Sequence, residues 1–342
     1  VASSILIFKF IKTNDSKIKK QKIKITKYLS TQKLSEETLL KIKNSITDEK
    51  INVFERNQFE VGERWMLAPN IIGSKLKIYE DKCVSIITNS LFGEEKKYIT
   101  LGDIADIGNG MVSGLDKAFQ IPKETRLNQK EKKATIPVVK AKNMERFIHK
   151  DITNYIFLNG VVQTENDLKE NYPAFYELLR GHKDQLELRY SYNRKINYWD
   201  WVFLRSFNLF KQEKERIFVP CKERISHKQY FRFSYVSSGV FPTQDVTAIF
   251  PKSNVKESIY YILALLSSEY VFEWLKHKGV IKGNIVEFSE KPLASIPMRL
   301  IDWNNPTDKK LHEEISTLCK KYIETNDECV LGNLNQKVSA LF

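Results

Sequence analysis

The sequence lacks any apolar run as long as the roughly 18–20 residues that a membrane-spanning helix needs. Its first residues also lack the succession of basic, apolar and small-residue regions found in a secretory signal peptide. Its only cysteines are Cys83, Cys221, Cys319 and Cys329, and none stands at a CxxC or Cys/His spacing. We therefore expect a cytoplasmic protein with reduced thiols, no membrane partner, no zinc site and no disulfide framework.

A complete nucleotide-binding motif is missing as well. The stretch 104–119, IADIGNGMVSGLDKAF, looks like a phosphate-holding loop because Gly108, Gly110 and Gly114 follow an apolar run. A dinucleotide loop, however, needs its third glycine where Ser113 stands, and an acidic residue about 20 positions later, where this chain reads NQKEKKAT. The glycines therefore do not predict a dinucleotide site.

Motifs for methyl transfer and for nuclease chemistry are also incomplete. Asp106 and the glycines after it loosely resemble a loop that binds S-adenosylmethionine, but an amino-methylating enzyme also needs (Asn/Asp/Ser)-Pro-Pro-(Tyr/Phe), and the chain has no Pro-Pro. The nearest approach is Asn305-Pro306-Thr307, which reads as a turn. Glu-x-Lys triplets of the nuclease type fall in lysine-rich turns. We expect no catalytic residue, no metal and no cofactor within this chain.

The sequence is rich in positive charge and in aromatic side chains. Its 55 Lys and Arg residues outnumber its 42 Asp and Glu residues, which gives a formal net charge of +13 at pH 7, and 12% of the residues are aromatic. Cations attract phosphates, and aromatic faces stack on bases. This combination favours a polyanionic partner and, among polyanions, nucleic acid.

The first part of the chain, residues 1–50, reads as a β-hairpin followed by a helix. The expected strands are residues 4–10 and a run around 23–25, joined by a polar, basic turn. The helix begins at Ser35, a good N-cap residue with acidic residues in the turn after it. Residues 51–97 look like a connector, and we expect a domain boundary in this region.

The larger part of the chain, residues 98–330, has a different texture. Short strand-like runs such as RIFVP and VTAIF are separated by turns rich in Asn, Gly, Pro and Lys. Three helices are expected, over 172–190, 256–277 and 308–324. Residues 331–342 read as a polar tail.

Read with its flanks, the glycine stretch resembles the opening of a known family of domains. GMVSG (110–114) and DKAF (116–119) are similar to the Gly-x-x-(Ser/Thr)-Gly turn and the acidic, Ala-Phe segment of TaqI-like C-terminal specificity domains. These are the target-recognition domains of adenine-N6 DNA methyltransferases and type IIG restriction–modification enzymes. Further similar segments follow in the family's order, and they are 136–147, 171–189, 199–205, 214–220, 262–275 and 293–298.

The resemblance covers nearly the whole chain and implies an α+β fold. Residues 98–330 would form a recognition domain with a curved mixed β-sheet and flanking helices, and residues 1–50 would be the C-terminal end of a methyltransferase domain. The chain would then be a fragment of a longer protein. S-adenosylmethionine would be bound by the catalytic domain outside this chain.

The function implied by the resemblance is to read a short double-stranded DNA sequence and to position an adenine for N6 methylation. The implied partners are double-stranded DNA and the methyltransferase domain of the same protein. An alternative is a specificity subunit similar to that of type I systems, which would act in trans without catalysis of its own.

This implied function selects candidate DNA-binding residues. Arg pairs with guanine and Asn with adenine in the major groove, so RYSYNRK (189–195) is the main candidate for base reading. The glycine turn would let backbone N–H groups approach DNA closely. Trp199 and Trp201 are expected to be core or loop anchors instead. The candidates are Gly110, Ser113, Gly114, Lys117, Arg189, Tyr192, Asn193, Arg194, Arg205, Lys222, Arg224, Lys282 and Asn284.

Overall fold

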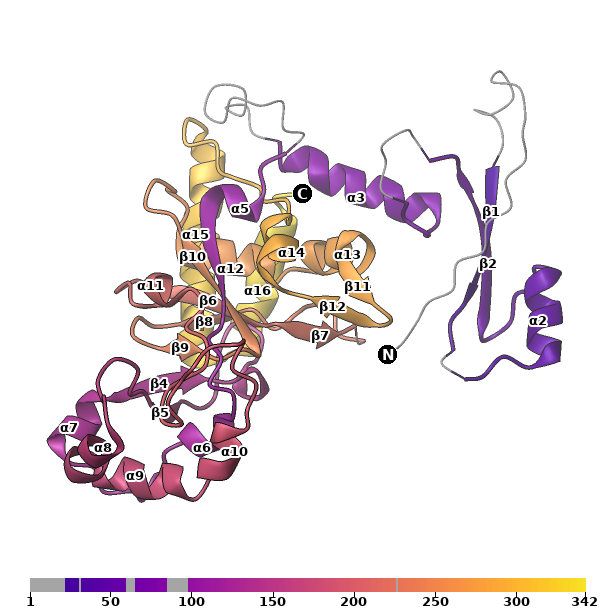
Figure 1. The fold of residues 1–342 in the computed structure, drawn as a ribbon. Coiled ribbons are helices and arrows are strands. Elements are labelled where there is room, and N and C mark those ends of the chain that lie inside the picture. The colour runs from indigo at the N-terminus through magenta and orange to yellow at the C-terminus, as the bar shows by residue number, and fades with distance from the viewer. Residues whose placement is uncertain (1–21, 31, 60–64, 85–97, 226) are drawn as a thin grey trace.

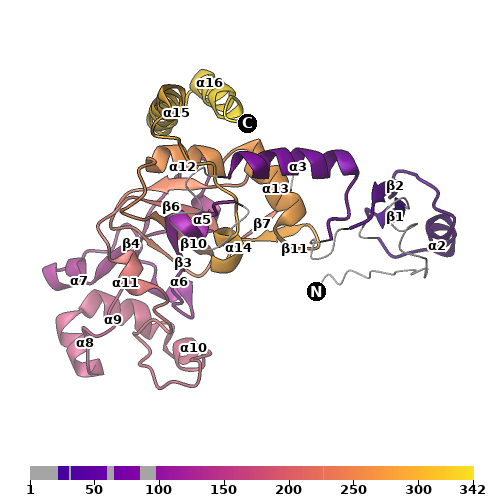
Figure 2. The same ribbon diagram turned by 90° about the horizontal axis from the view of Figure 1, so that it is seen from above.

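The structure of the chain is a computed structural model that describes residues 22–30, 32–59, 65–84, 98–225 and 227–342. Figures 1 and 2 show a central body of sheets and helices, a lobe on one side of it, and a small N-terminal unit that stands apart from both. Within the described part of the chain, no helix has the length and apolar character needed to cross a bilayer.

The N-terminal unit consists of two strands and one helix. Strand β1 (Lys22–Tyr28) pairs antiparallel with β2 (Ile51–Asn57) along its whole length. Helix α2 (Glu36–Lys43) begins after Ser35, whose hydroxyl accepts a hydrogen bond from the Thr38 N–H at 3.2 Å. The predicted strand around 23–25 and the predicted helix start are thus confirmed. The predicted strand 4–10 lies outside the described residues, and the described partner of β1 is β2, from the stretch read as a connector.

Helix α3 (Asn70–Lys82) leads from this unit to the body. Leu76 and Tyr79 belong to the main hydrophobic core, and the buried Glu80 carboxylate accepts hydrogen bonds from Trp274 Nε1 at 2.9 Å and Lys278 Nζ at 2.7 Å. A buried carboxylate is tolerated when it is paired in this way. The helix is therefore held to the body by both apolar and polar contacts.

A four-stranded antiparallel sheet forms the centre of the body. Its strands lie in the order β3 (Ala105–Asn109), β10 (Val246–Pro251), β6 (Arg216–Pro220) and β8 (Ser234–Val236). The runs RIFVP and VTAIF, predicted as strands, form β6 and most of β10, and their residues are buried on both faces. Continuous apolar runs of this kind suit a strand covered on two sides.

Two further sheets flank the central one. One has the order β5 (Thr153–Ile156), β4 (Thr135–Val139) and β9 (Phe241–Pro242), with β4 and β9 parallel. The other has the order β11 (Val280–Lys282), β12 (Ile285–Glu287) and β7 (Lys222–Arg224), all antiparallel. The α+β class is confirmed. After the N-terminal unit, the described strands lie in three small sheets, and the single curved sheet implied for residues 98–330 is not confirmed.

The central sheet separates two hydrophobic cores. Along β6, Ile217 and Val219 belong to the main core and Phe218 to a second core, and Ile249 and Phe250 of β10 divide in the same way. This alternation follows from the two-residue period of strand side chains. The second core fills the lobe, whose helices are α6 (Asp116–Phe119), α7 (Gln129–Lys133), α8 (Glu165–Asn171), α9 (Pro173–Arg180), α10 (Lys183–Glu187) and α11 (Phe207–Phe210), with the 3-10 turn η1 (Ala141–Asn143) nearby.

The main core is covered by helices from the C-terminal third of the chain. These are α12 (Ile259–Leu266), α13 (Glu269–Lys278), α15 (Pro306–Thr325) and α16 (Glu328–Ser339), with the short helices α5 (Leu101–Ile104) and α14 (Glu290–Ala294) at one end of β3. Figure 2 shows α15 and α16 as an outer pair over α12. The segment read as a polar tail is therefore mostly helical, and Val330, Leu334 and Val338 bury its apolar side.

Two of the three predicted helices are interrupted. The stretch 172–190 forms α9 and α10, which are separated at Gly181 and His182. The stretch 256–277 breaks after Leu266, where the Ser268 hydroxyl caps α13 by accepting the Val271 N–H at 3.3 Å. Both stretches keep an apolar period across the break, so periodicity alone predicts a single helix. The third prediction, 308–324, is confirmed by α15.

Candidate nucleic-acid interface

The glycine turn, residues 110–114, follows β3 and lies against the protein's own backbone. The Gly110 N–H donates to the Val246 carbonyl at 3.0 Å, and a Cβ at Gly110 would stand 2.0 Å from the Thr243 carbonyl oxygen. Gly114 has a φ of +85°, and a Cβ there would stand 2.6 Å from Val202 Cγ2. Both glycines are thus required where chain segments approach one another closely.

This packing also decides whether the turn fits a cofactor. A Cβ at Gly108 would lie 2.8 Å from Ser206 Cβ, so protein atoms already occupy the space beside this glycine as well as that beside Gly110. A glycine loop that holds a nucleotide needs free backbone N–H groups facing open space. The residues of the turn therefore do not fit S-adenosylmethionine.

A network of polar side chains anchors the turn, and we call it the anchoring network. The Ser113 hydroxyl donates to Asp116, and Lys140 binds Asp116, Asp245 Oδ1 at 2.8 Å and Thr243 Oγ1 at 2.7 Å. Ser113 is fully buried and the Lys140 side chain is only 13% exposed. The candidate hydroxyl of Ser113 is therefore committed to this anchoring network and is not presented at the surface.

The ionisation of the network follows from its contacts. Burial alone would lower the pKa of Lys140, but hydrogen bonds to Asp116 and Asp245 outweigh it and raise that pKa. Burial alone would likewise raise the pKa of Asp245, but hydrogen bonds from Lys140 and Thr243 lower it. The lysine and this aspartate therefore stabilise one another in their charged forms.

Arg189 clamps the next segment onto the turn. Its guanidinium donates to the Ser113 carbonyl at 3.2 Å, to the Asn197 carbonyl at 3.1 Å and to the Asp200 carbonyl, and it lies over the Phe119 ring. Burial lowers the pKa of Arg189 to about 10, so the group remains charged at neutral pH. A guanidinium bound to three carbonyls has a structural position, in contrast to the base-reading role that the sequence suggested.

The remaining candidates of this segment gather around an exposed phenylalanine. Phe203 exchanges backbone hydrogen bonds with Val112 of the turn, at 2.9 and 3.0 Å. The guanidinium groups of Arg194 and Arg205 lie 5.0 and 5.2 Å from the centre of the Phe203 ring. Tyr192 lies 5.6 Å from the same ring, measured between centroids, and Tyr190 lies 4.7 Å from Tyr192. We call Tyr190, Tyr192, Arg194, Phe203 and Arg205 the aromatic tip.

The structure thus brings the glycine turn and the segment 189–205 together. Lys117 follows the turn on α6 and is exposed, and Asn193 is exposed beside the aromatic tip. Trp199 and Trp201 are buried, with their indole nitrogens bonded to the Val162 and Ile156 carbonyls, so their prediction as anchors is confirmed.

The other four candidates form a separate group on the sheet β11–β12–β7. Arg224 pairs with Ile285 and Lys222 with Glu287 across β7 and β12, and the Asn284 carbonyl accepts the Ile225 N–H at 2.8 Å. Lys282 binds Glu287 Oε2 at 2.6 Å, and this contact lowers the pKa of Glu287. In Figure 1 this sheet lies beneath α13, whereas the aromatic tip belongs to the lobe.

Sequence reasoning missed Lys140, Thr243, Asp245 and Phe203. The sequence contains a weak indication for two of them. Lys140 is a charged residue directly after the apolar strand β4, and Asp245 is a charged residue directly before the apolar strand β10. Their pairing depends on β9 lying beside β4, which no local pattern indicates. Phe203 carries no distinguishing sequence signal, because an exposed and a buried phenylalanine read alike.

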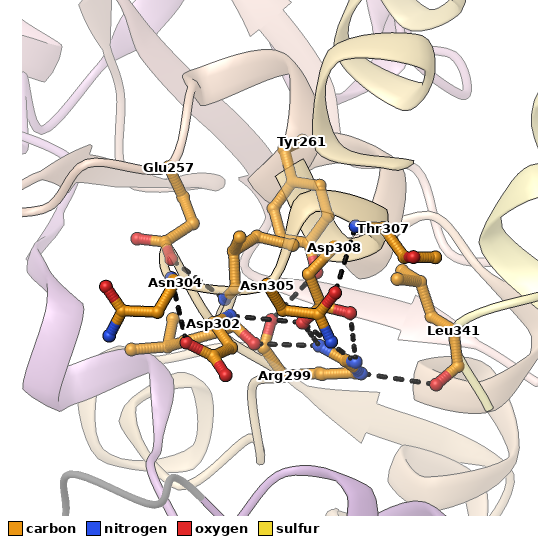
Figure 3. Close-up of polar contacts among 11 residues, drawn as sticks. Glu257, Tyr261, Arg299, Asp302, Asn304, Asn305, Thr307, Asp308 and Leu341 are labelled. Atoms are coloured by element: carbon orange, nitrogen blue, oxygen red, sulfur yellow. Dashed lines mark hydrogen bonds and ion pairs between the residues drawn. The ribbon is translucent and has the colours of Figure 1, made fainter. Parts of the chain in front are cut away.

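The segment closest to a catalytic motif is a helix cap. Asn305 is the N-cap of α15, its side-chain oxygen accepts the Thr307 N–H at 2.9 Å, and Pro306 opens the helix (Figure 3). Next to it, Arg299 binds Asp308 Oδ1 at 3.1 Å and the Leu341 carbonyl at 3.2 Å, which joins the start of α15 to the end of the chain. In the part of the chain that the structure describes, no three His, Cys, Asp or Glu side chains converge on a point where a metal ion could bind.

Comparison with known proteins adds two curated relatives. The chain is 41% identical over 344 residues to the type II methyltransferase M.HindII of Haemophilus influenzae, covering 100% of this chain and 64% of that protein. It is 34% identical over 206 residues to the type II methyltransferase M.MjaIV of Methanocaldococcus jannaschii, covering 58% of this chain and 67% of that protein. The chain thus spans just under two thirds of the length of M.HindII. No protein-family model matches the chain.

Among solved structures, the type IIL restriction–modification enzyme MmeI in complex with DNA aligns with a TM-score of 0.47 at 13% identity. The alignment covers 71% of this chain and 33% of that protein.

Proposed function

This chain belongs to the family of type II methyltransferases, and from that premise we propose that it is the part which recognises a short DNA sequence. In this proposal it positions an adenine of double-stranded DNA for N6 methylation within a restriction–modification system. The relatives support the methyltransferase setting. The recognition role is supported by the formal net charge of +13 and by the contacts around the glycine turn.

The observation that carries the proposal is the pairing of Val112 with Phe203. It joins the glycine turn to the segment that bears Asn193, Arg194 and Arg205, so amide and guanidinium donors project from one anchored piece of structure. These are the side chains whose geometry matches adenine and guanine edges in the major groove. The anchoring network and Arg189 hold this piece at its base, which limits the conformational entropy lost on binding.

The cationic group on β11–β12–β7 has a different part in the proposal. Lys222, Arg224 and Lys282 lie on short strands with exposed side chains, and cations so placed attract phosphates of any sequence. We assign to them affinity and orientation on the duplex, and to Asn193, Arg194 and Arg205 the reading of bases.

The methyl transfer itself is assigned to a catalytic part outside this chain, which would bind S-adenosylmethionine. The turn's lack of fit for a cofactor supports this division of labour. We assign the N-terminal unit to the C-terminal end of the methyltransferase domain, whose catalytic residues would lie outside this chain. None of the eight described residues of α2 is buried, and Leu39 and Leu40 are exposed, which suits a surface that another domain covers.

The proposal is tested by selection from a pool of randomised duplexes. The 342-residue chain is incubated with the pool at near-physiological salt, and the retained DNA is sequenced. A motif of a few fixed base pairs that contains an adenine is the expected result. Retention of all sequences alike, lost as the salt concentration rises, would contradict sequence recognition by this chain and leave only attraction to phosphates.

A further inference from the structure

We propose that the aromatic tip enters the base stack of the bound duplex, where Tyr190, Tyr192 and Phe203 stack on bases of a locally unstacked step. The inference rests on the proposed function and deepens it, because it states how the interface holds DNA. The occupant is double-stranded DNA. Extrusion of a base for chemistry requires unstacking, and aromatic side chains offer replacement stacking partners at such a step.

The first support is the exposure of the three rings. Tyr190 is 70% exposed, Tyr192 38% and Phe203 37%, although the rings already contact one another. Other large aromatic side chains of the same lobe, such as Phe119 and Trp201, are buried in the second core. A row of rings held together at the surface is a ready stacking platform, since every base has a π-face.

The second support is the backbone that carries the rings. The Arg194 N–H donates to the Ser191 carbonyl at 3.2 Å, and the two residues between them, Tyr192 and Asn193, have φ values of 55° and 59°. Positive φ at both central positions is the pattern of a type I′ turn. Asn tolerates this region, but Tyr adopts it only at an energetic cost. The turn therefore holds Tyr192 against Phe203 at an energetic cost, which points to a function for that position.

The third support is the charge around the rings. Arg194 donates to the Val202 carbonyl at 2.6 Å, and Arg205 donates to the Tyr192 hydroxyl at 3.3 Å. Within the described residues, neither guanidinium forms an ion pair with a carboxylate. Cations left without a counter-charge beside exposed rings fit a partner that offers both phosphates and bases. An apolar protein surface would supply no such counter-charge.

The inference is tested with the 342-residue chain and a short duplex that carries the selected motif or, failing a motif, a random sequence. Affinity is measured as a function of salt concentration for Tyr190→Ala and Phe203→Ala. The rescue variants Tyr190→Phe and Phe203→Tyr keep a ring at each position. Two controls are included. Leu188→Ala removes an exposed but non-aromatic side chain beside the tip, and Tyr176→Ala removes a half-buried ring that lies beside Arg180 on α9, in a variant first checked for an unchanged fold.

The expected result is that each tip Ala variant weakens binding about 5- to 150-fold, as loss of a stacked base does. In these variants the slope of the logarithm of affinity against the logarithm of salt concentration stays unchanged, because no charge is removed. The rescue variants and both controls bind like the unaltered chain. 2-Aminopurine is placed in the motif, or at successive positions of the random duplex. Its fluorescence should increase on binding where it occupies the unstacked step, and this increase should be lost in Phe203→Ala.

The inference would be overturned if both tip Ala variants bound DNA as tightly as the unaltered chain and gave the same gain in 2-aminopurine fluorescence. Should Phe203→Ala lose its fold, Phe203→Leu keeps the apolar contact while removing the ring, and Tyr190 is exposed enough to be replaced without structural cost. The two proposals fail in different ways. If the unaltered chain selects no motif, the proposed function fails; if it selects a motif that the tip variants select equally tightly, only the stacking inference fails.

Discussion

Phe203 and Val112 exchange two backbone hydrogen bonds, so a residue of the glycine turn and an exposed ring of the lobe belong to one rigid unit. Segments from different parts of the chain thereby act together. The turn contributes tight packing, the segment after α10 contributes donors and rings, and the anchoring network and Arg189 support both.

Arg189→Ala is expected to destabilise the junction by about 1–3 kcal/mol, because the carbonyls of Ser113, Asn197 and Asp200 lose their donor. The free energy of unfolding, measured by urea denaturation, checks this. Arg180→Ala is the control, because Arg180 is exposed on α9 and its contacts among the described residues are with its helix neighbours Glu177 and Tyr176. Equal stability of the two variants would show that the clamp contributes nothing.

Lys140→Met should cost about 2–3 kcal/mol, since Asp116 and Asp245 are left as partly buried carboxylates without a counter-charge. Adding Asp245→Asn to Lys140→Met should recover part of this loss, because it removes one of the unpaired charges. If the double variant lost more free energy of unfolding than the two single variants lost together, the ionic description of the network would be contradicted. Denaturation of all three variants gives the comparison.

The pH dependence of the same network has a definite sign. Asp245 has a lowered pKa in the folded chain, so its contribution is present above its unfolded value, near 3.8, and is lost as pH falls through the lower folded value. The stability difference between the unaltered chain and Asp245→Asn should therefore be constant from pH 5 to 8 and shrink below about pH 4. A difference that grows on acidification would contradict the assigned pairing.

Lys140 has the opposite dependence. Its pKa is raised by folding, so its contribution is complete below the ordinary lysine value of 10.5 and is lost as pH rises through the higher folded value. The stability difference between the unaltered chain and Lys140→Met should consequently shrink only above about pH 10. A change near neutral pH would indicate that another group supplies the charge.

Gly110→Ala is expected to destabilise the fold by about 3 kcal/mol or more, because a Cβ would stand 2.0 Å from the Thr243 carbonyl oxygen, and backbone atoms cannot easily yield. Gly332→Ala is the matched control. It lies within α16 with no atom within 4 Å of the added Cβ, so this variant should gain about 0.5–1 kcal/mol from helix propensity. Thermal unfolding of both variants should show shifts of opposite sign.

Local sequence signals predicted the elements that depend on local chemistry. Ser35 as a helix cap, β6 and β10 as strands, α15, and the buried positions of Trp199 and Trp201 all follow from residue type and spacing. The breaks at Gly181 and Ser267 were missed because the apolar period continues across them. The division of the strands after the N-terminal unit into three sheets was not predicted, because pairing between distant strands leaves no local pattern.

The candidate site was predictable to a similar degree. The sequence placed DNA-binding candidates in the turn and in the segment 189–205, and the structure brings these together. It could not distinguish an anchoring arginine, Arg189, from the exposed Arg194, because the difference lies in the carbonyls each one meets. The DNA-binding roles themselves remain predictions.

The most direct test compares the DNA motifs retained by the unaltered chain and by Arg194→Ala under identical salt. We expect a motif in both, with one base-pair position relaxed in the variant, at a cost of about 1–3 kcal/mol for the preferred base. An equal loss of affinity for every sequence, with the motif unchanged, would show Arg194 to be a phosphate contact. Absence of a motif from the unaltered chain would contradict its role in sequence recognition.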